Sequence, residues 1–391
     1  MRRNQGTTAF SLSLVALFLA TLIVQPRSLA QTQLDKSFPV EGGGFTQDPS
    51  KLSTKESVDF PQDQSFDKFD FENGLVAEEP EPVPAEPAPA EPASAVAITP
   101  NPTLPGGVDH VASGTGTRNA GFGTIRLRGV PAGATVVRAW LYWGTVVRLP
   151  VPNTASANFN GTTVTGRKIN ASTPEPCWLF QNANFVAYRA SVRTLLNAAV
   201  NADYKVTQLA SAVTNGTDPF TCAPPFPTPA TPGQEGATLL VIYSHSTVPN
   251  AARTYIHQGP ALVTGNTTVT NNLNPLVPSH SIIKQTRFGA DGQVGCSLFS
   301  VGSLNGEMTA IGPNLGAMLQ IKGPGSTVNT NSDWNGGDGL TLNQLWDTQT
   351  DTFGSVNGIT NILPTGSARY FVQYTSIGDC FVTVAHVLTA K

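Results

Sequence analysis

Short strand-like runs separated by Gly, Pro and Asn fill the sequence from residue 135 to its end, and this pattern constrains the fold most. Residues 135–143 alternate regularly, which predicts a β-strand with two distinct faces. One face is apolar and the other is amphipathic, so we expect the second face to be partly covered as well. The first face holds Val137, Ala139, Leu141 and Trp143, and the second holds Arg138, Trp140 and Tyr142.

Residues 157–165 predict a β-hairpin around Asn160-Gly161, because Asn-Gly is the preferred pair for a two-residue hairpin turn. One short helix is predicted over residues 187–200, where Val192, Leu195, Leu196 and Val200 have helical spacing. Many short strands with one helix favour a single all-β domain, a β-sandwich or jelly roll. Further strands are predicted at residues 204–213, 237–243, 254–256, 267–270, 316–321, 369–374 and 381–388.

The N-terminal part has a different composition. Residues 1–30 combine Arg2 and Arg3, an apolar run and Ser28-Leu29-Ala30, which is typical of a cleavable signal peptide. The apolar run is shorter than the ~20 residues of a membrane span, so we expect export and a mature chain without a transmembrane anchor. Residues 31–107 are acidic and then rich in Ala, Glu and Pro, which predicts a disordered, extended linker. Residues 108–391 would form the β domain.

Charge is also distributed unevenly between the linker and the β domain. The overall formal charge is -3, and the acidic excess lies in the linker. Basic residues of the β domain are scattered, which gives no indication of nucleic-acid binding.

All four cysteines, Cys177, Cys222, Cys296 and Cys380, follow the predicted signal peptide. An even number in an exported chain favours disulfides over a metal site, and three pairings are possible. We favour Cys177 with Cys222 and Cys296 with Cys380, because the first two enclose one loop-rich region and the others lie in strand-like segments.

Five segments together resemble a known family. They are Arg138-Ala-Trp-Leu-Tyr-Trp-Gly144, Asn158-Phe-Asn-Gly-Thr-Thr-Val164, the run from Phe185 to Leu195, the run from Gly236 to Tyr243 leading to His257, and the run from Leu345 to Phe353. In this order they resemble an uncharacterised all-β domain of large bacterial and archaeal cell-surface proteins, often placed ahead of adhesin-like repeats. The chain departs from that pattern at Ser244–Pro249, where the family tends to have an acidic residue and a proline. The resemblance implies an extracellular location and an all-β fold.

Residues 331–351 concentrate acids among glycines and carry the site predictions. Carboxylates on such loops suit Ca²⁺, and turn chemistry accounts for the same residues without a metal. The calcium candidates are Asp333, Asp338, Asp347 and Asp351. If two of these acids flank a sugar bond instead, the chain would be a secreted polysaccharide hydrolase. The candidates for an aromatic ligand-binding surface are Trp178, Trp334 and Trp346.

Catalytic sequence motifs are not found: G-x-S-x-G and H-E-x-x-H are both absent from the sequence. Of the five histidines, His245 and His257 could approach if residues 241–243 paired with Tyr255. The sequence therefore favours a non-enzymatic, exported surface or extracellular protein with a structural or adhesive role. Its partners would be glycans or proteins of a cell surface or matrix.

Overall fold

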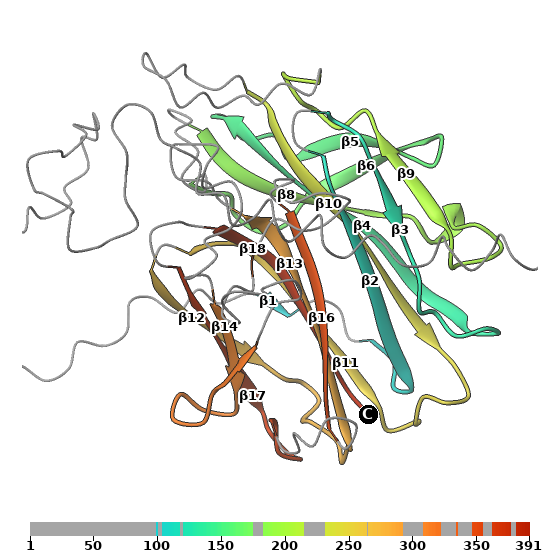
Figure 1. Ribbon diagram of the computed structural model, residues 1–391, viewed down its shortest axis with the longest axis vertical. Helices are drawn as coiled ribbons and strands as arrows, with labels where there is room; N and C mark the ends of the chain where they lie inside the picture. The colour runs from blue at the N-terminus through green and yellow to red at the C-terminus, as the bar shows by residue number, and fades with distance from the viewer. Residues whose placement is uncertain are drawn as a thin grey trace, which may run out of the picture. The chain divides into compact units, whose positions relative to one another are not determined.

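The computed structural model describes residues 99–100, 104–117, 120–174, 183–214, 231–263, 265–291, 308–321, 334, 346–354, 362–376 and 381–391. All of them belong to one compact unit, Pro87–Lys391. They form an all-β, sandwich-like domain of antiparallel sheets, as the sequence predicts (Figure 1). The described part holds no helix long and apolar enough to cross a membrane.

The largest sheet has nine strands and is called the large sheet. Its strand order is β2-β10-β4-β8-β6-β5-β9-β3, with β7 paired to β8. The bounds are β2 Val108–Gly116, β3 Gly123–Arg126, β4 Thr135–Arg148, β5 Thr154–Phe159, β6 Thr162–Lys168, β7 Thr173–Pro174, β8 Ala183–Ser191, β9 Asp203–Thr207 and β10 Gly233–Ser244.

The large sheet curls on itself until it is nearly closed. Its two end strands, β2 and β3, lie in contact, and the Ser113 hydroxyl donates to the Arg126 carbonyl between them. The curled sheet encloses an apolar core that includes Leu141, Trp143 and Tyr188. The predicted Asn160-Gly161 hairpin is present between β5 and β6, with positive φ at both residues.

Two further sheets complete the domain. The middle sheet has the order β1-β11-β18-β13-β16, and the small sheet has the order β12-β17-β14-β15. The bounds are β1 Thr99–Pro100, β11 Arg253–Val263, β12 Asn266–Asn272, β13 Ile282–Asp291, β14 Met308–Gly312, β15 Leu319–Ile321, β16 Trp346–Gly354, β17 Arg369–Thr375 and β18 Phe381–Ala390. Thr99–Pro100, assigned to the linker from sequence, pairs with β11.

The middle sheet buries both of its faces. One apolar core joins it to the large sheet through residues such as Trp140, Tyr142 and Phe288. A second core joins it to the small sheet through residues such as Leu388 and Val372. The central strand β18 is accordingly buried along its whole length.

Strand β4 confirms the predicted alternation and shows why both faces are apolar. Leu141 and Trp143 point into the core of the curled sheet, and Trp140 and Tyr142 point toward the middle sheet. Val137 departs from the pattern, since it packs on the middle-sheet side. The pairing with β10 jumps from Arg138 to Val136 at this point, so a β-bulge moves Val137 to the other face.

The predicted helix at residues 187–200 is wrong. Its first residues belong to β8, which pairs with β4, and only a 3-10 turn at Arg193–Leu195 follows. Sheet pairing overrides local helical spacing here, because β8 alternates between the two cores it separates. Leu195, Leu196 and Val200 pack against the edge of the large-sheet core, which explains their apolar character.

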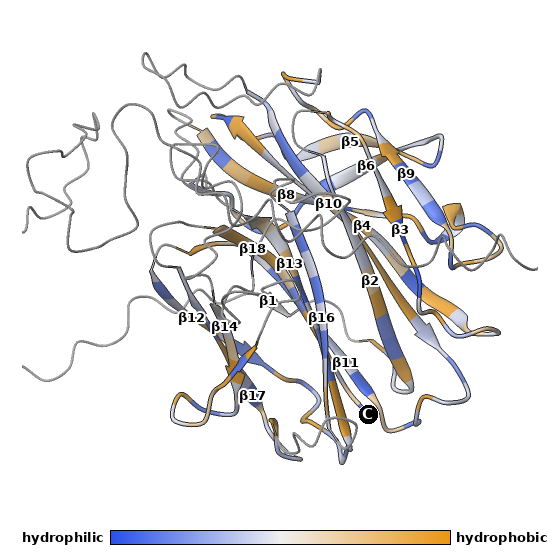
Figure 2. Ribbon diagram, in the orientation of Figure 1, coloured by the Kyte–Doolittle hydropathy of each residue, from blue (hydrophilic) through white to orange (hydrophobic). Residues whose placement is uncertain are grey.

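Figure 2 shows that most strands mix hydrophobic and hydrophilic residues, and that β16 is largely hydrophilic. Polar residues are buried at the interfaces of the middle sheet, where Arg287, His257 and His386 are each almost completely inaccessible to solvent.

Candidate functional site

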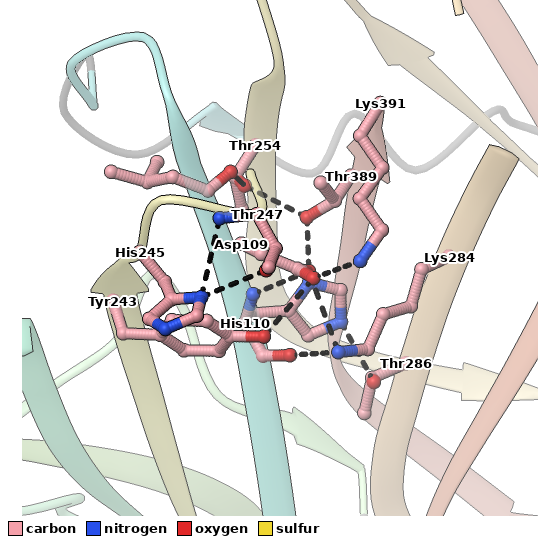
Figure 3. Close-up of polar contacts among 11 residues, drawn as sticks. Asp109, His110, Tyr243, His245, Thr247, Thr254, Lys284, Thr286, Thr389 and Lys391 are labelled. Carbon is pink, nitrogen blue, oxygen red and sulfur yellow. Dashed lines mark hydrogen bonds and ion pairs between the residues drawn. The ribbon is translucent and has the colours of Figure 1, made fainter. Parts of the chain in front are cut away.

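Asp109 is the centre of a buried polar cluster between the large and middle sheets (Figure 3). We call Asp109, His110, Lys284 and Lys391 the Asp109 cluster. One carboxylate oxygen contacts the Lys391 ammonium and accepts a 3.1 Å hydrogen bond from the Tyr243 hydroxyl. The other oxygen lies 3.4 Å from Lys284 Nζ. Two cations from the middle sheet therefore meet one carboxylate from the large sheet.

A chain of hydroxyl groups fixes the protonation of His110. The Thr254 hydroxyl donates its hydrogen to the Val108 carbonyl, so it accepts the hydrogen of the Thr389 hydroxyl 2.7 Å away. Thr389 then accepts from His110 Nδ1 at 2.7 Å, which leaves Nε2 to accept from the Thr286 hydroxyl at 2.9 Å. The imidazole is neutral, carries its hydrogen on Nδ1 and has a partner for both nitrogens.

The ionisation of the cluster follows from burial and from the two lysines. Burial of Asp109 alone would raise its pKa, but Lys284, His110 and Lys391 outweigh that effect and lower the pKa to about 2. Burial, reinforced by Lys284, lowers the pKa of His110 to about 3. At neutral pH the cluster therefore combines an ionised carboxylate with a neutral imidazole, and neither group is free to exchange a proton with a substrate.

Of the four acids predicted to bind calcium or to catalyse hydrolysis, the two that the structure describes, Asp347 and Asp351, do not converge. Asp347 and Asp351 lie on β16 and not on a loop. Residues four apart on a strand are about 13 Å apart, which is too far to share one Ca²⁺ or to flank one sugar bond. Asp351 is already ion-paired with Arg287, which is buried, and also accepts from Gln285 at 3.1 Å. The two other candidates, Asp333 and Asp338, lie outside the described residues.

The predicted aromatic surface is not present where the structure describes it. Trp334 and Trp346 are 0% exposed. Trp334 stacks on Phe381 and donates to the Thr309 hydroxyl, and Trp346 donates to the Thr238 hydroxyl. The expectation that these two rings are exposed is wrong, because both fill the interfaces of the middle sheet. Trp178 lies outside the described residues, as do all four cysteines, so their pairing stays a prediction.

The suggested approach of His245 to His257 does not occur through strand pairing. β10 pairs with β2 and β4, whereas β11 pairs with β18 and β1. His245 is half-buried and contacts Thr247, and His257 is buried against Tyr370. Among the described residues, no three His, Cys, Asp or Glu side chains form a group arranged to hold a metal.

Sequence reasoning missed the Asp109 cluster. Its only local signal is a pair of ionisable residues, Asp109-His110, inside the strand-like run Val108–Gly116. A buried charge requires a partner, so such a pair indicates a long-range contact without identifying it.

Comparisons with known proteins add little. No protein-family model matches the chain, and no curated protein matches it either. Among solved structures, the Sputnik virophage structure matches with 9% sequence identity over 81% of this chain and 91% of that chain, at a TM-score of 0.16. The infectious bursal disease virus VP2 subviral particle matches with 12% identity over 75% of this chain and 82% of that chain, at a TM-score of 0.11. Neither likeness is close enough to support an argument about function.

Proposed function

We propose that the chain is an exported protein whose β domain has a non-enzymatic, structural or adhesive role at the cell surface or outside the cell. The predicted signal peptide at residues 1–30 supports export, and the proline-rich linker would hold the domain away from its attachment point. The resemblance to surface-protein domains supports the same location.

The proposal rests on the observation that the buried charges of the domain are paired between strands. Asp109 joins two lysines of the neighbouring sheet, and Asp351 joins Arg287. In both cases a carboxylate holds strands together, whereas a hydrolase needs carboxyl groups that face a substrate. Of the described acids predicted to catalyse hydrolysis, Asp351 is ion-paired and Asp347 is 2% exposed.

The location can be tested by producing the full chain in a bacterial host. Intact-mass analysis should show removal of residues 1–30. The β domain should either be found in the medium or be released from whole cells by external protease. A chain that keeps its first 30 residues and stays in the cytoplasm would contradict the proposal.

The role can be tested with beads coated with the exported chain. The beads should adhere to cells or to a glycan of an array, and polysaccharides incubated with the chain should show no new reducing ends. Release of reducing ends, lost in the Asp351→Asn variant, would support the hydrolase instead.

A further inference from the structure

Two histidines and a tyrosine from three strands meet between the middle and small sheets. His257 lies on β11, His386 on β18 and Tyr370 on β17, and all three are fully buried. The Tyr370 hydroxyl oxygen lies 3.1 Å from His257 Nδ1 and 2.6 Å from His386 Nδ1. With Asn271 of β12 these residues form what we call the histidine–tyrosine cluster.

The outer nitrogen of each histidine is fixed as a donor. His257 Nε2 lies 2.8 Å from the Asn272 carbonyl, which can only accept. His386 Nε2 contacts the side-chain oxygen of Gln285, whose amide nitrogen donates to Asp351. Both Nε2 atoms therefore carry the hydrogen, and in the neutral rings both Nδ1 atoms present a lone pair to the same phenol oxygen.

The number of hydrogens does not match the number of acceptors. The phenol has one hydrogen and can donate it to only one Nδ1, so the second Nδ1 faces the oxygen with no hydrogen between them. Both rings are fully buried, and burial favours the neutral imidazole, so neither ring supplies an additional hydrogen.

Asn271 adds a second group without a partner. Its side chain is 0% exposed, and neither its oxygen nor its nitrogen has a hydrogen-bond partner of normal geometry. Asn271 is directly opposite Tyr370 in the pairing of β12 with β17. Burial, together with Tyr374, raises the pKa of Tyr370 well above its ordinary value, and the Asn271 amide lies close enough to the phenol to oppose that rise. An unpartnered buried amide is costly, so both atoms are available to a ligand at this position.

We propose that the histidine–tyrosine cluster binds one divalent transition-metal ion of the Zn²⁺ class. Its ligands would be Nδ1 of His257 and His386, the Tyr370 oxygen and the side-chain oxygen of Asn271. Imidazole and phenolate suit Zn²⁺ or Cu²⁺ rather than Ca²⁺. On binding, the phenol loses its proton to water and the metal–oxygen bond replaces the O–H bond.

The surrounding geometry fits this chemistry. Metal-bound histidines commonly donate their other N–H to a carbonyl or carboxylate, as His257 and His386 do here. Tetrahedral Zn²⁺ with bonds of about 2.0 Å places its ligands roughly 3.3 Å apart, so the two oxygen–nitrogen separations would open by roughly 0.2 and 0.7 Å. Arg287, the nearest cation on β13, is paired with Asp351, which limits its repulsion of a bound metal.

Such a metal would connect the middle sheet to the small sheet.

Zn²⁺ and Cu²⁺ are the probes for this site. The full chain is treated with chelator, its cysteines are oxidised or alkylated so that they cannot bind metal, and Zn²⁺ is titrated calorimetrically. We expect one Zn²⁺ per chain and a higher melting temperature. With Cu²⁺ we expect a visible tyrosinate-to-copper charge-transfer band.

Tyr370→Phe removes only the phenol oxygen and should weaken Zn²⁺ binding by about tenfold or more. The His245→Gln variant changes a histidine outside the cluster, so it is the matched control and should bind as the unmodified chain does. The proposal is overturned if the chain retains no stoichiometric Zn²⁺, or if Tyr370→Phe binds Zn²⁺ equally well. If Tyr370→Phe does not fold, the charge-transfer band of the unmodified chain decides, and its absence also overturns the proposal.

Discussion

The interior of the curled large sheet differs from the interfaces on either side of the middle sheet. The large-sheet core is apolar and aromatic, with Trp143 stacked on Tyr188 and Phe159 stacked on Tyr204. The middle-sheet interfaces bury Asp109 and His110 on one side and Arg287 and His386 on the other.

The difference teaches how each part is held in register. Within the large sheet, backbone hydrogen bonds align neighbouring strands, so apolar packing is sufficient to complete the core. No backbone ladder joins separate sheets, and apolar contacts alone specify their relative position weakly. Buried polar contacts are directional, and we infer that the Asp109 cluster sets how the large and middle sheets are aligned.

Lowering the pH should change the free energy of unfolding more than any substitution below, because buried histidines lie at the middle-sheet interfaces. Burial lowers the pKa of His110 to about 3 and of His257 to about 4, and lowers that of His386 as well. The unfolded chain takes up protons near pH 6.5 and the folded chain does not, so stability is full above pH 6.5 and falls below it. At pH 5, His110 and His257 should each cost about 2 kcal/mol of unfolding free energy, and His386 acts in the same direction.

Urea unfolding at pH 7.5 and pH 5 measures this loss. The difference between the two pH values should shrink in His110→Gln. Equal stability at both pH values would show that the buried histidines do not stay neutral.

Asp109→Ala should have the next largest effect. It removes the carboxylate that Lys284 and Lys391 share and leaves both ammonium groups partly buried. Breaking a buried pair in this way costs about 3 to 5 kcal/mol. The matched control is Asp203→Ala, because Asp203 pairs with Arg128 at 2.6 Å on the exposed surface and should cost at most about 1 kcal/mol. If thermal unfolding showed similar losses of stability in the two variants, the distinction between the buried and the exposed ion pair would be wrong.

Gly236→Ala tests packing at the same interface and should have the smallest effect. A Cβ at Gly236 would lie 2.3 Å from Trp346 Cγ, so the strand or the indole must move. Overpacking of this kind costs about 1 to 3 kcal/mol. Gly316→Ala, where the nearest atom is 3.4 Å away, should be nearly neutral. A Gly236→Ala variant with unchanged unfolding midpoint would mean that Trp346 is not packed against β10.

Local pattern predicted many of the strands but not all of them, since β2 and β13 were not predicted and the strand predicted at residues 204–213 ends at Thr207. It did not predict the polar interior. The alternation of residues 135–143 and the Asn160-Gly161 turn depend on neighbouring residues, and both are confirmed apart from Val137, which a β-bulge moves to the other face. The helix at residues 187–200 was mispredicted because the partners of β8, which are distant in sequence, decide its conformation. Trp346 was expected to be exposed for the same reason, since no residue near it in the sequence indicates that it packs against Gly236 of β10.

The Asp109 cluster shows the limit most clearly. Lys391 is 282 residues from Asp109 in the sequence. The Lys284 amino group donates to the His110 carbonyl, which is 174 residues away. Sequence can indicate that a buried charge needs a partner, but only the stacking of the sheets selects which one.

A double-mutant cycle between Asp109 and Lys391 tests the central claim most directly. The free energy of unfolding is measured for the unmodified chain, for Asp109→Ala, for Lys391→Ala and for the variant with both changes, beside the same cycle for Asp203 and Arg128. We predict a coupling energy of about 1.5 kcal/mol or more for the buried pair and less than about 0.5 kcal/mol for the exposed pair. Equal coupling energies in the two cycles would contradict the claim that Asp109 aligns the sheets.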